Sequence, residues 1–263
     1  MISELNQTKQ LFFLMGMPRS GNTLFSSIMN QNPELVVTAN SITLEIMKNL
    51  FLLKQTEVFQ NYPDHKSLDN VLDCVYNIYY KDWPQKYIID RGPIMTKENF
   101  ALMQKHYRRL FKCIVLVRDL MDVLASYMQW YTKNPDAFIN RLNLKNDEEK
   151  LFWLMKDDGA IAKELKAIQN SFNYKGLCCY IKYDDLVSNT EQCINDVYKF
   201  LNIPSFQHKF FDLDQINING ISYNDRIVGK NMHTIRNEIK KEYNPYIEKI
   251  PQRIREKYGH IKF

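Results

Sequence analysis

Residues 11–33 read LFFLMGMPRSGNTLFSSIMNQNP and are the most informative part of the sequence. The apolar run Leu11 to Met15 is typical of a buried strand, and residues 23–30 have the spacing of a helix. The loop between them is bounded by Gly16 and Gly21. Backbone N–H groups converge in such a loop, and the dipole of the following helix adds partial positive charge, so anions bind there. The stretch therefore predicts a phosphate-binding loop; a plain tight turn is the alternative.

One position of the loop departs from the nucleotide P-loop pattern. The spacing of Gly16, Gly21 and Thr23 meets that pattern, but Asn22 stands where the Lys belongs. In a nucleoside triphosphate enzyme that Lys reaches the terminal phosphates and the next hydroxyl holds magnesium. The cation of this loop lies inside it, at Arg19. The loop is therefore still predicted to bind an anion, but the missing Lys makes a nucleoside triphosphatase less favoured.

Four more short apolar runs accompany the first, and longer segments with helical spacing lie between them. The other predicted strands are Leu35 to Ala39, Tyr87 to Asp90, Cys113 to Val117 and Cys178 to Lys182. The predicted helices are Thr23 to Asn30, Ile42 to Lys54, Leu68 to Tyr80, Lys97 to Arg109, Met121 to Trp130, Glu148 to Gln169 and Thr190 to Leu201, with a short last one ending at Tyr258. This alternation predicts an α/β, three-layer, P-loop-like fold with a central parallel sheet flanked by helices.

The composition excludes several classes of protein. The first apolar run stops at Gly16, far short of the roughly 20 residues of a bilayer span, and polar residues precede it instead of a basic leader. The five cysteines form no CxxC pair, which disfavours a disulfide framework or a zinc site and favours a reducing, cytoplasmic location. The net charge is +5 with scattered Lys and Arg, which suits a small anionic ligand better than nucleic acid.

No repeat or long linker interrupts the chain, so residues 1–263 are predicted to form a single domain, with residues 205–245 as a loop or lid.

Three motifs in order along the chain resemble one family. They are Pro18-Arg19-Ser20-Gly21-Asn22-Thr23, then Cys113-Ile-Val-Leu-Val-Arg118-Asp119 with Ser126, and then Tyr180-Ile-Lys-Tyr183-Asp184-Asp185-Leu186 followed by residues 190–204. Together they resemble the sulfotransferases that use 3′-phosphoadenosine 5′-phosphosulfate (PAPS), and more the bacterial and protein-tyrosine branch than the animal cytosolic branch. The resemblance spans Leu11 to Pro204 and implies the same fold, co-substrate and sulfuryl transfer, with no metal.

The resemblance also implies which residues bind the co-substrate. Residues 18–23 would contact the 5′-phosphosulfate, Arg118 and Ser126 the 3′-phosphate, and Tyr183 belongs to the third motif; a basic loop carrying Lys230 and Arg236 would close over the nucleotide. Arg118 also follows a strand end, where ligands of open α/β sheets gather, and a guanidinium can hold phosphate by two hydrogen bonds. The alternative for Arg118-Asp119 is a local salt bridge or a helix start capped by Asp119.

Sulfuryl transfer also requires stabilisation of the departing phosphate and a base for the acceptor's proton. Arg19 suits the first task, and Arg91 resembles the family's cation near the reacting group. The alternative is that Asp90 and Arg91 pair with each other or with a helix terminus. Asn40 stands where the protein-tyrosine branch has its Glu. The candidate bases are therefore Glu45, which in the alternative reading only favours the helix dipole, and His233, which titrates near neutrality.

Two other functions stay open at this stage. A small-molecule or nucleotide kinase is suggested by Thr23 and by apolar runs that end at Asp90 and Asp119, and a nucleotide-binding module without catalysis is suggested by the missing carboxylate at Asn40. For a sulfotransferase, the sequence does not predict the acceptor: a hydroxyl or amine of a small molecule, sugar, lipid or peptide stays open. The sequence does not predict the oligomeric state.

Overall fold

A five-stranded parallel sheet forms the centre of this computed structural model, which describes residues 9–107, 109 and 111–263. The strand order is β2-β3-β1-β4-β5. The strands are β1 (Gln10–Gly16), β2 (Leu35–Val37), β3 (Tyr87–Arg91), β4 (Cys113–Val117) and β5 (Cys178–Lys182). All five strands were predicted, and the parallel sheet is confirmed. The order places the ends of β1, β4 and β5 side by side, which brings the three sequence motifs to one edge of the sheet.

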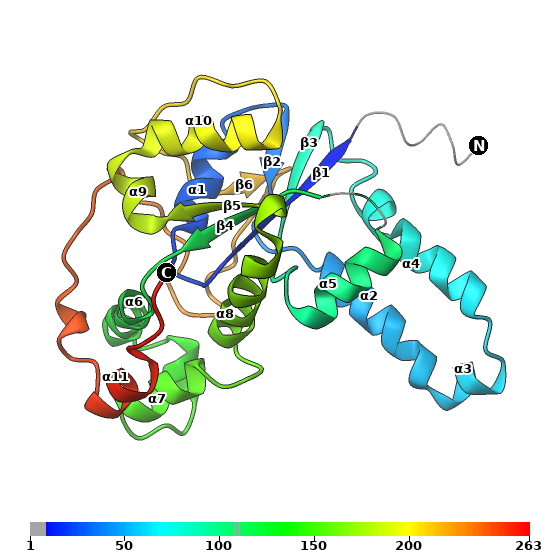
Figure 1. Ribbon diagram of the computed structural model, residues 1–263. Helices are drawn as coiled ribbons and strands as arrows, with labels where there is room; N and C mark the ends of the chain where they lie inside the picture. Colours follow the sequence, from blue (N-terminus) through cyan, green and yellow to red (C-terminus); the bar gives the residue numbers. More distant parts are fainter. Residues whose placement is uncertain (1–8, 108, 110) are drawn as a thin grey trace.

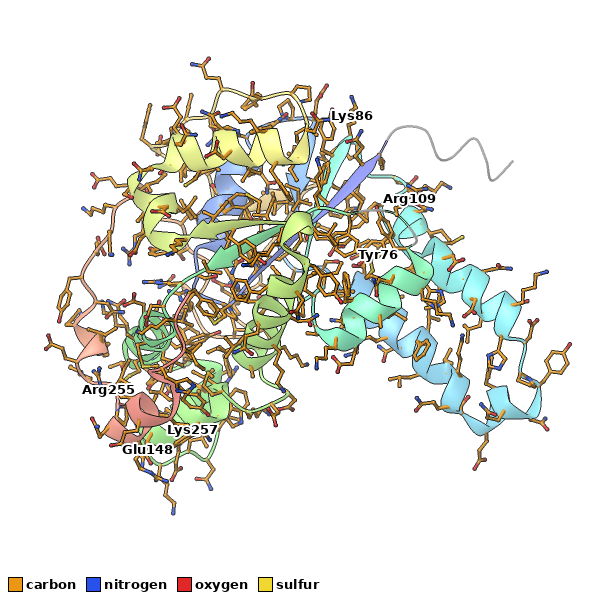
Figure 2. The ribbon with its side chains drawn as sticks, viewed as in Figure 1. Tyr76, Lys86, Arg109, Glu148, Arg255 and Lys257 are labelled. Atoms are coloured by element: carbon orange, nitrogen blue, oxygen red, sulfur yellow. The ribbon has the colours of Figure 1, made fainter. Side chains whose placement is uncertain are left out.

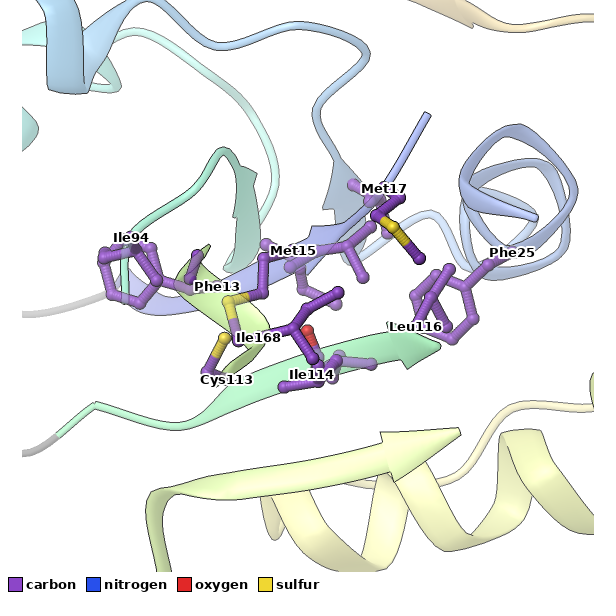
Figure 3. Close-up of a cluster of buried hydrophobic side chains, with 14 of the residues drawn as sticks. Phe13, Met15, Met17, Phe25, Ile94, Cys113, Ile114, Leu116 and Ile168 are labelled. Atoms are coloured by element: carbon purple, nitrogen blue, oxygen red, sulfur yellow. Dashed lines mark hydrogen bonds between the residues drawn. The ribbon is translucent and has the colours of Figure 1, made fainter. Parts of the chain in front are cut away.

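The inner part of β1 and the whole of β4 are apolar because helices cover both faces of the sheet. Residues 12–16 of β1 and all of β4 are buried. Phe13 and Cys113 are partners in the register between these strands. Figure 3 shows side chains of β1 and β4 packed together with Phe25 of the first helix and Ile168 of α8 (Ala160–Ser171). This packing fixes the strand that leads into the predicted phosphate-binding loop.

Helices lie on both sides of the sheet. In Figure 1, α1 and α10 lie above it and α5 and α8 lie below it. The helices are α1 (Asn22–Met29), α2 (Thr43–Leu52), α3 (Glu57–Asn61), α4 (His65–Tyr79), α5 (Lys97–His106), α6 (Leu120–Lys133), α7 (Asp147–Leu154), α8 (Ala160–Ser171), α9 (Tyr183–Ser188), α10 (Thr190–Leu201) and α11 (Gln252–Tyr258), with 3₁₀ turns η2 (Leu53–Gln55), η3 (Phe138–Arg141), η4 (Phe172–Leu177) and η5 (Pro245–Ile247).

The prediction of one helix from Glu148 to Gln169 was wrong, because the chain turns between α7 and α8. The Gly159 N–H donates to Lys156 O at 2.8 Å, and a Cβ at Gly159 would lie 2.8 Å from Leu154 O. Only glycine fits so close to a backbone oxygen.

The helices α3 and α9 were not predicted. The predicted helix from Lys97 ends at His106 instead of Arg109, and Arg108 lies outside the described residues.

Helices α2, α3 and α4 form an arm that extends away from the sheet at the lower right of Figure 1. The arm is joined to the core by Tyr76, whose ring packs edge-on against Phe13 of β1 with 5.6 Å between the centroids (Figure 2). The start of α2 is held on β3, because Ser41 Oγ and Thr43 Oγ1 both donate to Asp90 Oδ2 at 2.8 Å. Across the described residues, no helix reaches the length and apolarity needed to cross a bilayer.

Residues 205–244, all of which the structure describes, form no helix. Their regular structure is the antiparallel pair β6 (Asn217–Ile218) and β7 (Ile221–Ser222). After the pair, the chain runs past the end of the sheet at the left of Figure 1 to α11. Helix α11 ends at Tyr258, as predicted, and its Arg253 Nη1 donates to Glu148 Oε1 of α7 at 2.7 Å (Figure 2 labels Glu148). The single domain and the lid stay predictions.

Candidate active site

The loop between β1 and α1 turns on two residues with left-handed backbone conformations, Arg19 (φ 70°) and Gly21 (φ 95°). Ser20 closes the turn, because its N–H and its Oγ both donate to Met17 O, at 3.1 and 2.6 Å. Gly21 is the N-cap of α1, and no described side chain caps the helix. The first N–H groups of a helix lack partners within it. The loop therefore leaves backbone donors available to an anion.

Asn22 stabilises this loop from inside. Its Nδ2 donates to Met17 O at 2.9 Å and to Gly16 O at 3.2 Å, and the side chain is buried. The amide lies so close to Gly16 that a Cβ there would be 2.9 Å from Asn22 Oδ1. The residue that replaces the P-loop Lys thus bonds the loop's own carbonyls.

Tyr183, the first residue of α9, connects the loop with Arg118. A Cβ at Gly21 would lie 3.0 Å from Tyr183 Cδ2, so the ring packs directly on the loop. The Arg118 guanidinium carbon lies 4.0 Å from the centroid of the same ring, within the range of a cation–π interaction. Arg118 Nη1 also donates to Arg19 O at 2.7 Å. The three motifs therefore meet at one place.

A single cleft contains most of the predicted site residues. Those that line it are Pro18, Arg19, Gly21, Asn22, Thr23, Arg91, Arg118, Ser126, Tyr183, His233 and Arg236. The rest of its lining comes mainly from residues 232–244, the segment that runs past the sheet edge. Ser20, Glu45 and Lys230 lie outside the described lining. Ser20 is buried beneath the loop, whereas Glu45 and Lys230 are exposed.

Four arginines meet at the cleft, where Arg236 is paired with Glu242. In the described part of the chain, Arg19, Arg91 and Arg118 make no salt bridge. Burial lowers the pKa of the Arg19 guanidinium, and Arg118 and Arg236 lower it further. Among described side chains, Arg118 Nε is buried without a hydrogen-bond partner. Buried polar groups rarely lack a hydrogen-bond partner, and an anion in the cleft could accept a hydrogen bond from Arg118 Nε.

Arg19 spans the cleft floor. Its Nε donates to Ser126 Oγ on α6 at 3.1 Å, and its Nη1 donates to Met232 O at 2.6 Å. The guanidinium therefore joins the loop, the helix after β4 and the C-terminal segment. Ser126, predicted beside Arg118, also lies within reach of Arg19.

Arg91 and Asp90 do not pair with each other. Arg91 Nη1 donates to Ala39 O at 2.9 Å and to the hydroxyl of Tyr223 at 3.3 Å. Asp90 turns to the other side of β3, toward Ser41, Thr43 and Tyr80, and burial raises the pKa of its carboxyl. Arg91 is thus free to face the cleft.

The two carboxylates that suggested a kinase have other partners. Asp90 binds the start of the arm, as described above, and Asp119 Oδ1 accepts the Met121 N–H at 2.8 Å as the N-cap of α6. Asp119 Oδ2 accepts from Lys262 Nζ. Neither is part of the described cleft lining. Within the described ranges, no group of three or more His, Cys, Asp or Glu is arranged to hold a metal ion.

The two candidate bases differ in position. The Glu45 side chain is 62% exposed, and its carboxylate lies 3.9 Å from Lys48 Nζ. His233 lines the cleft, and its Nδ1 lies 2.5 Å from Asp225 Oδ1. Asp225 was not predicted, because it belongs to no motif and stands eight residues from the histidine.

A second carboxylate that sequence reasoning missed lies beneath the loop. Glu164 of α8 is buried, and its Oε2 accepts the Gly16 N–H at 3.1 Å. Burial raises the pKa of this carboxyl to about 7, against the opposing effects of Arg91 and of the Gly16 bond. No motif or spacing marks this contact, because α8 is distant from β1 in the sequence.

Comparison with known proteins agrees with this geometry. Residues 12–208 match the family described as "Sulfotransferase family". A Caenorhabditis briggsae protein described as "Putative protein-tyrosine sulfotransferase" is 25% identical over 204 residues, which are 76% of this chain and 68% of that protein. The sulfotransferase domain of the Synechococcus PCC 7002 olefin synthase is 11% identical, with 98% of both chains covered and a TM-score of 0.52.

The family match covers well over half of the chain, including all three motifs, most of β1 and the other four strands of the sheet. The olefin synthase domain shares the fold. The chain therefore belongs to the sulfotransferase family, whose members are transferases of sulfuryl groups.

Proposed function

We propose that this chain transfers the sulfuryl group of PAPS to an acceptor hydroxyl or amine. One observation carries the proposal: Arg19 and Arg118, which follow two neighbouring strands, meet in one cleft beside the uncapped start of α1 and have no acidic partner in the described chain. The negatively charged 3′-phosphate and 5′-phosphosulfate of PAPS would supply the missing negative charge. Family membership supports the reaction type.

The phosphosulfate end would bind the loop of residues 18–23. Backbone donors of the loop and of α1, the hydroxyl of Thr23 and the Arg19 guanidinium all border this part of the cleft. As the bond between sulfur and the 5′-phosphate breaks, negative charge grows on the phosphate oxygen. A fixed guanidinium and fixed N–H groups stabilise that charge without having to reorganise.

The 3′-phosphate would bind Arg118 and Ser126. The ring of Tyr183 holds the guanidinium plane, and Nε has no other partner in the described chain. Arg236 lines the same cleft and makes a salt bridge with Glu242 on the surface, from which it can turn to the nucleotide. Lys230 receives no role, because it lies outside the described lining.

The acceptor would enter beside Arg91 and His233, which line the cleft together with Arg19. His233 is the proposed base, and Glu45 receives no role because its carboxylate faces solvent and Lys48. Small molecules, sugars, lipids and peptides all stay candidate acceptors. The similar Caenorhabditis briggsae protein, described as acting on protein tyrosine, keeps peptides among them.

A thermal-shift titration tests the nucleotide. Ligands that bind only the native state raise its stability by RT ln(1 + [L]/Kd), which is about 2.7 kcal/mol at 100 times Kd. We expect adenosine 3′,5′-bisphosphate to stabilise the protein without magnesium. Stabilisation by ATP with magnesium alone would favour the kinase instead, and no response to either would contradict the proposal.

Release of bisphosphate from PAPS tests the reaction. Arg19→Ala should lower turnover by about 100-fold or more, the scale expected for one preorganised charge contact. Arg253→Ala is the matched control, because it removes the same charge from an exposed site on α11. Its turnover should equal that of the wild type. Unchanged turnover in Arg19→Ala would remove this residue from the mechanism.

A further inference from the structure

Asp225 and His233 form a pair at the cleft that is joined by two hydrogen bonds. Asp225 Oδ1 lies 2.5 Å from His233 Nδ1, and Asp225 Oδ2 accepts the backbone N–H of His233 at 2.9 Å. One carboxylate therefore holds both the ring and the backbone of the histidine. Because an ionised carboxylate can only accept hydrogen bonds, this contact places a proton on Nδ1, and in the neutral ring Nε2 then has a free lone pair.

The loop between these two residues is anchored to α6 and to the turn that follows it. The Trp130 Nε1–H donates to Lys230 O at 3.0 Å, and the Phe138 N–H donates to Val228 O at 2.8 Å. Gly229 has φ +114°, and a Cβ there would lie 2.6 Å from Ala137 Cα. The pair therefore stands on a loop fixed to the core, as a catalytic group requires.

Tyr223 fixes the plane of the histidine ring. The two rings stack with centroids 3.7 Å apart and planes 3° apart. The Tyr223 hydroxyl donates to Ala39 O at 2.9 Å and accepts from Arg91 Nη1 at 3.3 Å. Tyr223 therefore connects His233, through the stacked rings, to Arg91, through the hydroxyl; Arg91 is the cation beside which we propose that the acceptor binds.

We propose that Asp225 is a positioning residue that, with the stacked Tyr223 ring, holds His233 as the base of sulfuryl transfer, with Nδ1–H on Asp225 and Nε2 toward the acceptor. This inference rests on the proposed function. The acceptor oxygen forms its bond to sulfur as the bond between sulfur and the 5′-phosphate oxygen breaks. The electron pair leaves with the bisphosphate, and the acceptor proton goes to Nε2. Asp225 then stabilises the imidazolium.

Electrostatics keep this histidine neutral before the reaction. Burial lowers the pKa of His233, Arg91 and Arg19 lower it further, and the hydrogen bond and charge of Asp225 raise it. A base must start without its proton, and a neighbouring carboxylate favours the protonated form that the reaction creates. Arg19 and Arg91 thus favour the neutral ring that accepts the proton, and Asp225 favours the protonated ring that results.

Nuclear magnetic resonance of the imidazole nitrogens tests the geometry without an acceptor. His233→Gln identifies the signal in the whole protein with bisphosphate bound. We expect the neutral tautomer with Nδ1 protonated, and we expect Asp225→Asn to lower the pKa of the ring. A histidine with its proton on Nε2, or a pKa that does not change in Asp225→Asn, would overturn the proposal.

Turnover of PAPS with simple phenols and with water as acceptors tests the role. Asp225→Asn should lower kcat by about 100-fold, within the range of general-base effects, and should move the acidic limb of the pH profile to lower pH. Asp225→Glu should recover part of the rate, and Tyr223→Phe, which keeps the stacked ring, should lose only a few-fold. Bisphosphate affinity and Tm should stay close to the wild type in all three.

These outcomes separate the two proposals. If the wild type neither binds bisphosphate nor consumes PAPS, the proposed function fails. If the wild type consumes PAPS and Asp225→Asn is as active as the wild type with an unmoved pH profile, only the role of Asp225 fails. A rate loss in Asp225→Asn with an equal loss of bisphosphate affinity would indicate a structural role and would also overturn the inference.

Discussion

Asn22→Asp should destabilise the protein although the two side chains have the same shape. The Asn22 amide donates to Met17 O at 2.9 Å and to Gly16 O at 3.2 Å in a buried position. A carboxylate cannot donate, so both carbonyls lose their partner and face a negative charge. Each hydrogen bond contributes about 0.5–1.5 kcal/mol, and an unsatisfied buried group costs about 1–3 kcal/mol. We expect a loss of about 2–4 kcal/mol in the free energy of unfolding.

Urea denaturation at pH 7.5, followed by circular dichroism, measures this loss. Asn49→Asp is the matched control, because Asn49 is exposed on α2; surface substitutions usually change stability by less than about 0.5 kcal/mol. Asn22→Ala should fall between the two, since it removes the donors without adding charge. An Asn22→Asp variant as stable as its control would refute the role of this amide in holding the loop.

Three further changes test other contacts of the site. Gly21→Ala should cost about 1–2 kcal/mol of unfolding free energy, because φ is +95° and the new Cβ would meet Tyr183 Cδ2 at 3.0 Å; denaturation that matches the wild type would contradict this. Tyr183→Ala should weaken bisphosphate binding about tenfold in calorimetry by removing the ring under Arg118, whereas Tyr183→Phe should bind like the wild type. Folding raises the pKa of Glu164 from 4.5 to about 7. The contribution of this carboxyl to the free energy of unfolding is therefore fully present below pH 4.5 and is lost as the pH rises through 7. The stability of the wild type relative to Glu164→Gln should therefore fall by up to about 3 kcal/mol between pH 4 and 8, and a pH-independent difference would show that Glu164 does not titrate in this way.

The sheet could be predicted because its strands are continuous apolar runs. Covered on both faces, they need no alternation of polar residues, and each run ends where a polar loop begins. The break before α8 was also marked in the sequence, by Asp157-Asp158-Gly159, a typical turn composition. Helical spacing on both sides of this turn obscured it. The helix α9 was hidden because Tyr183 directly continues a strand, with no linker between them.

The meeting of the three motifs in one cleft could be predicted because their residues follow strand ends. Arg19, Arg118 and Tyr183 come after β1, β4 and β5, which lie side by side. The positions of Asp225 and Tyr223 beside His233, and of Glu164 beneath the loop, could not be predicted, because these residues lie on segments whose path depends on tertiary packing. Glu45 is a residue that the sequence suggested for the site but that tertiary packing places outside it. Its place in the first turn of α2 was predictable, but the exposed face on which it lies was not.

Calorimetric titration with adenosine 3′,5′-bisphosphate and with adenosine 5′-monophosphate tests most directly whether one cleft binds both phosphates of the nucleotide. A charged hydrogen bond contributes about 1.5–3 kcal/mol, so the wild type should prefer the bisphosphate by about tenfold or more. Arg118→Ala should lose most of that preference while binding the monophosphate as the wild type does. An equal preference in the wild type and in Arg118→Ala would contradict the account.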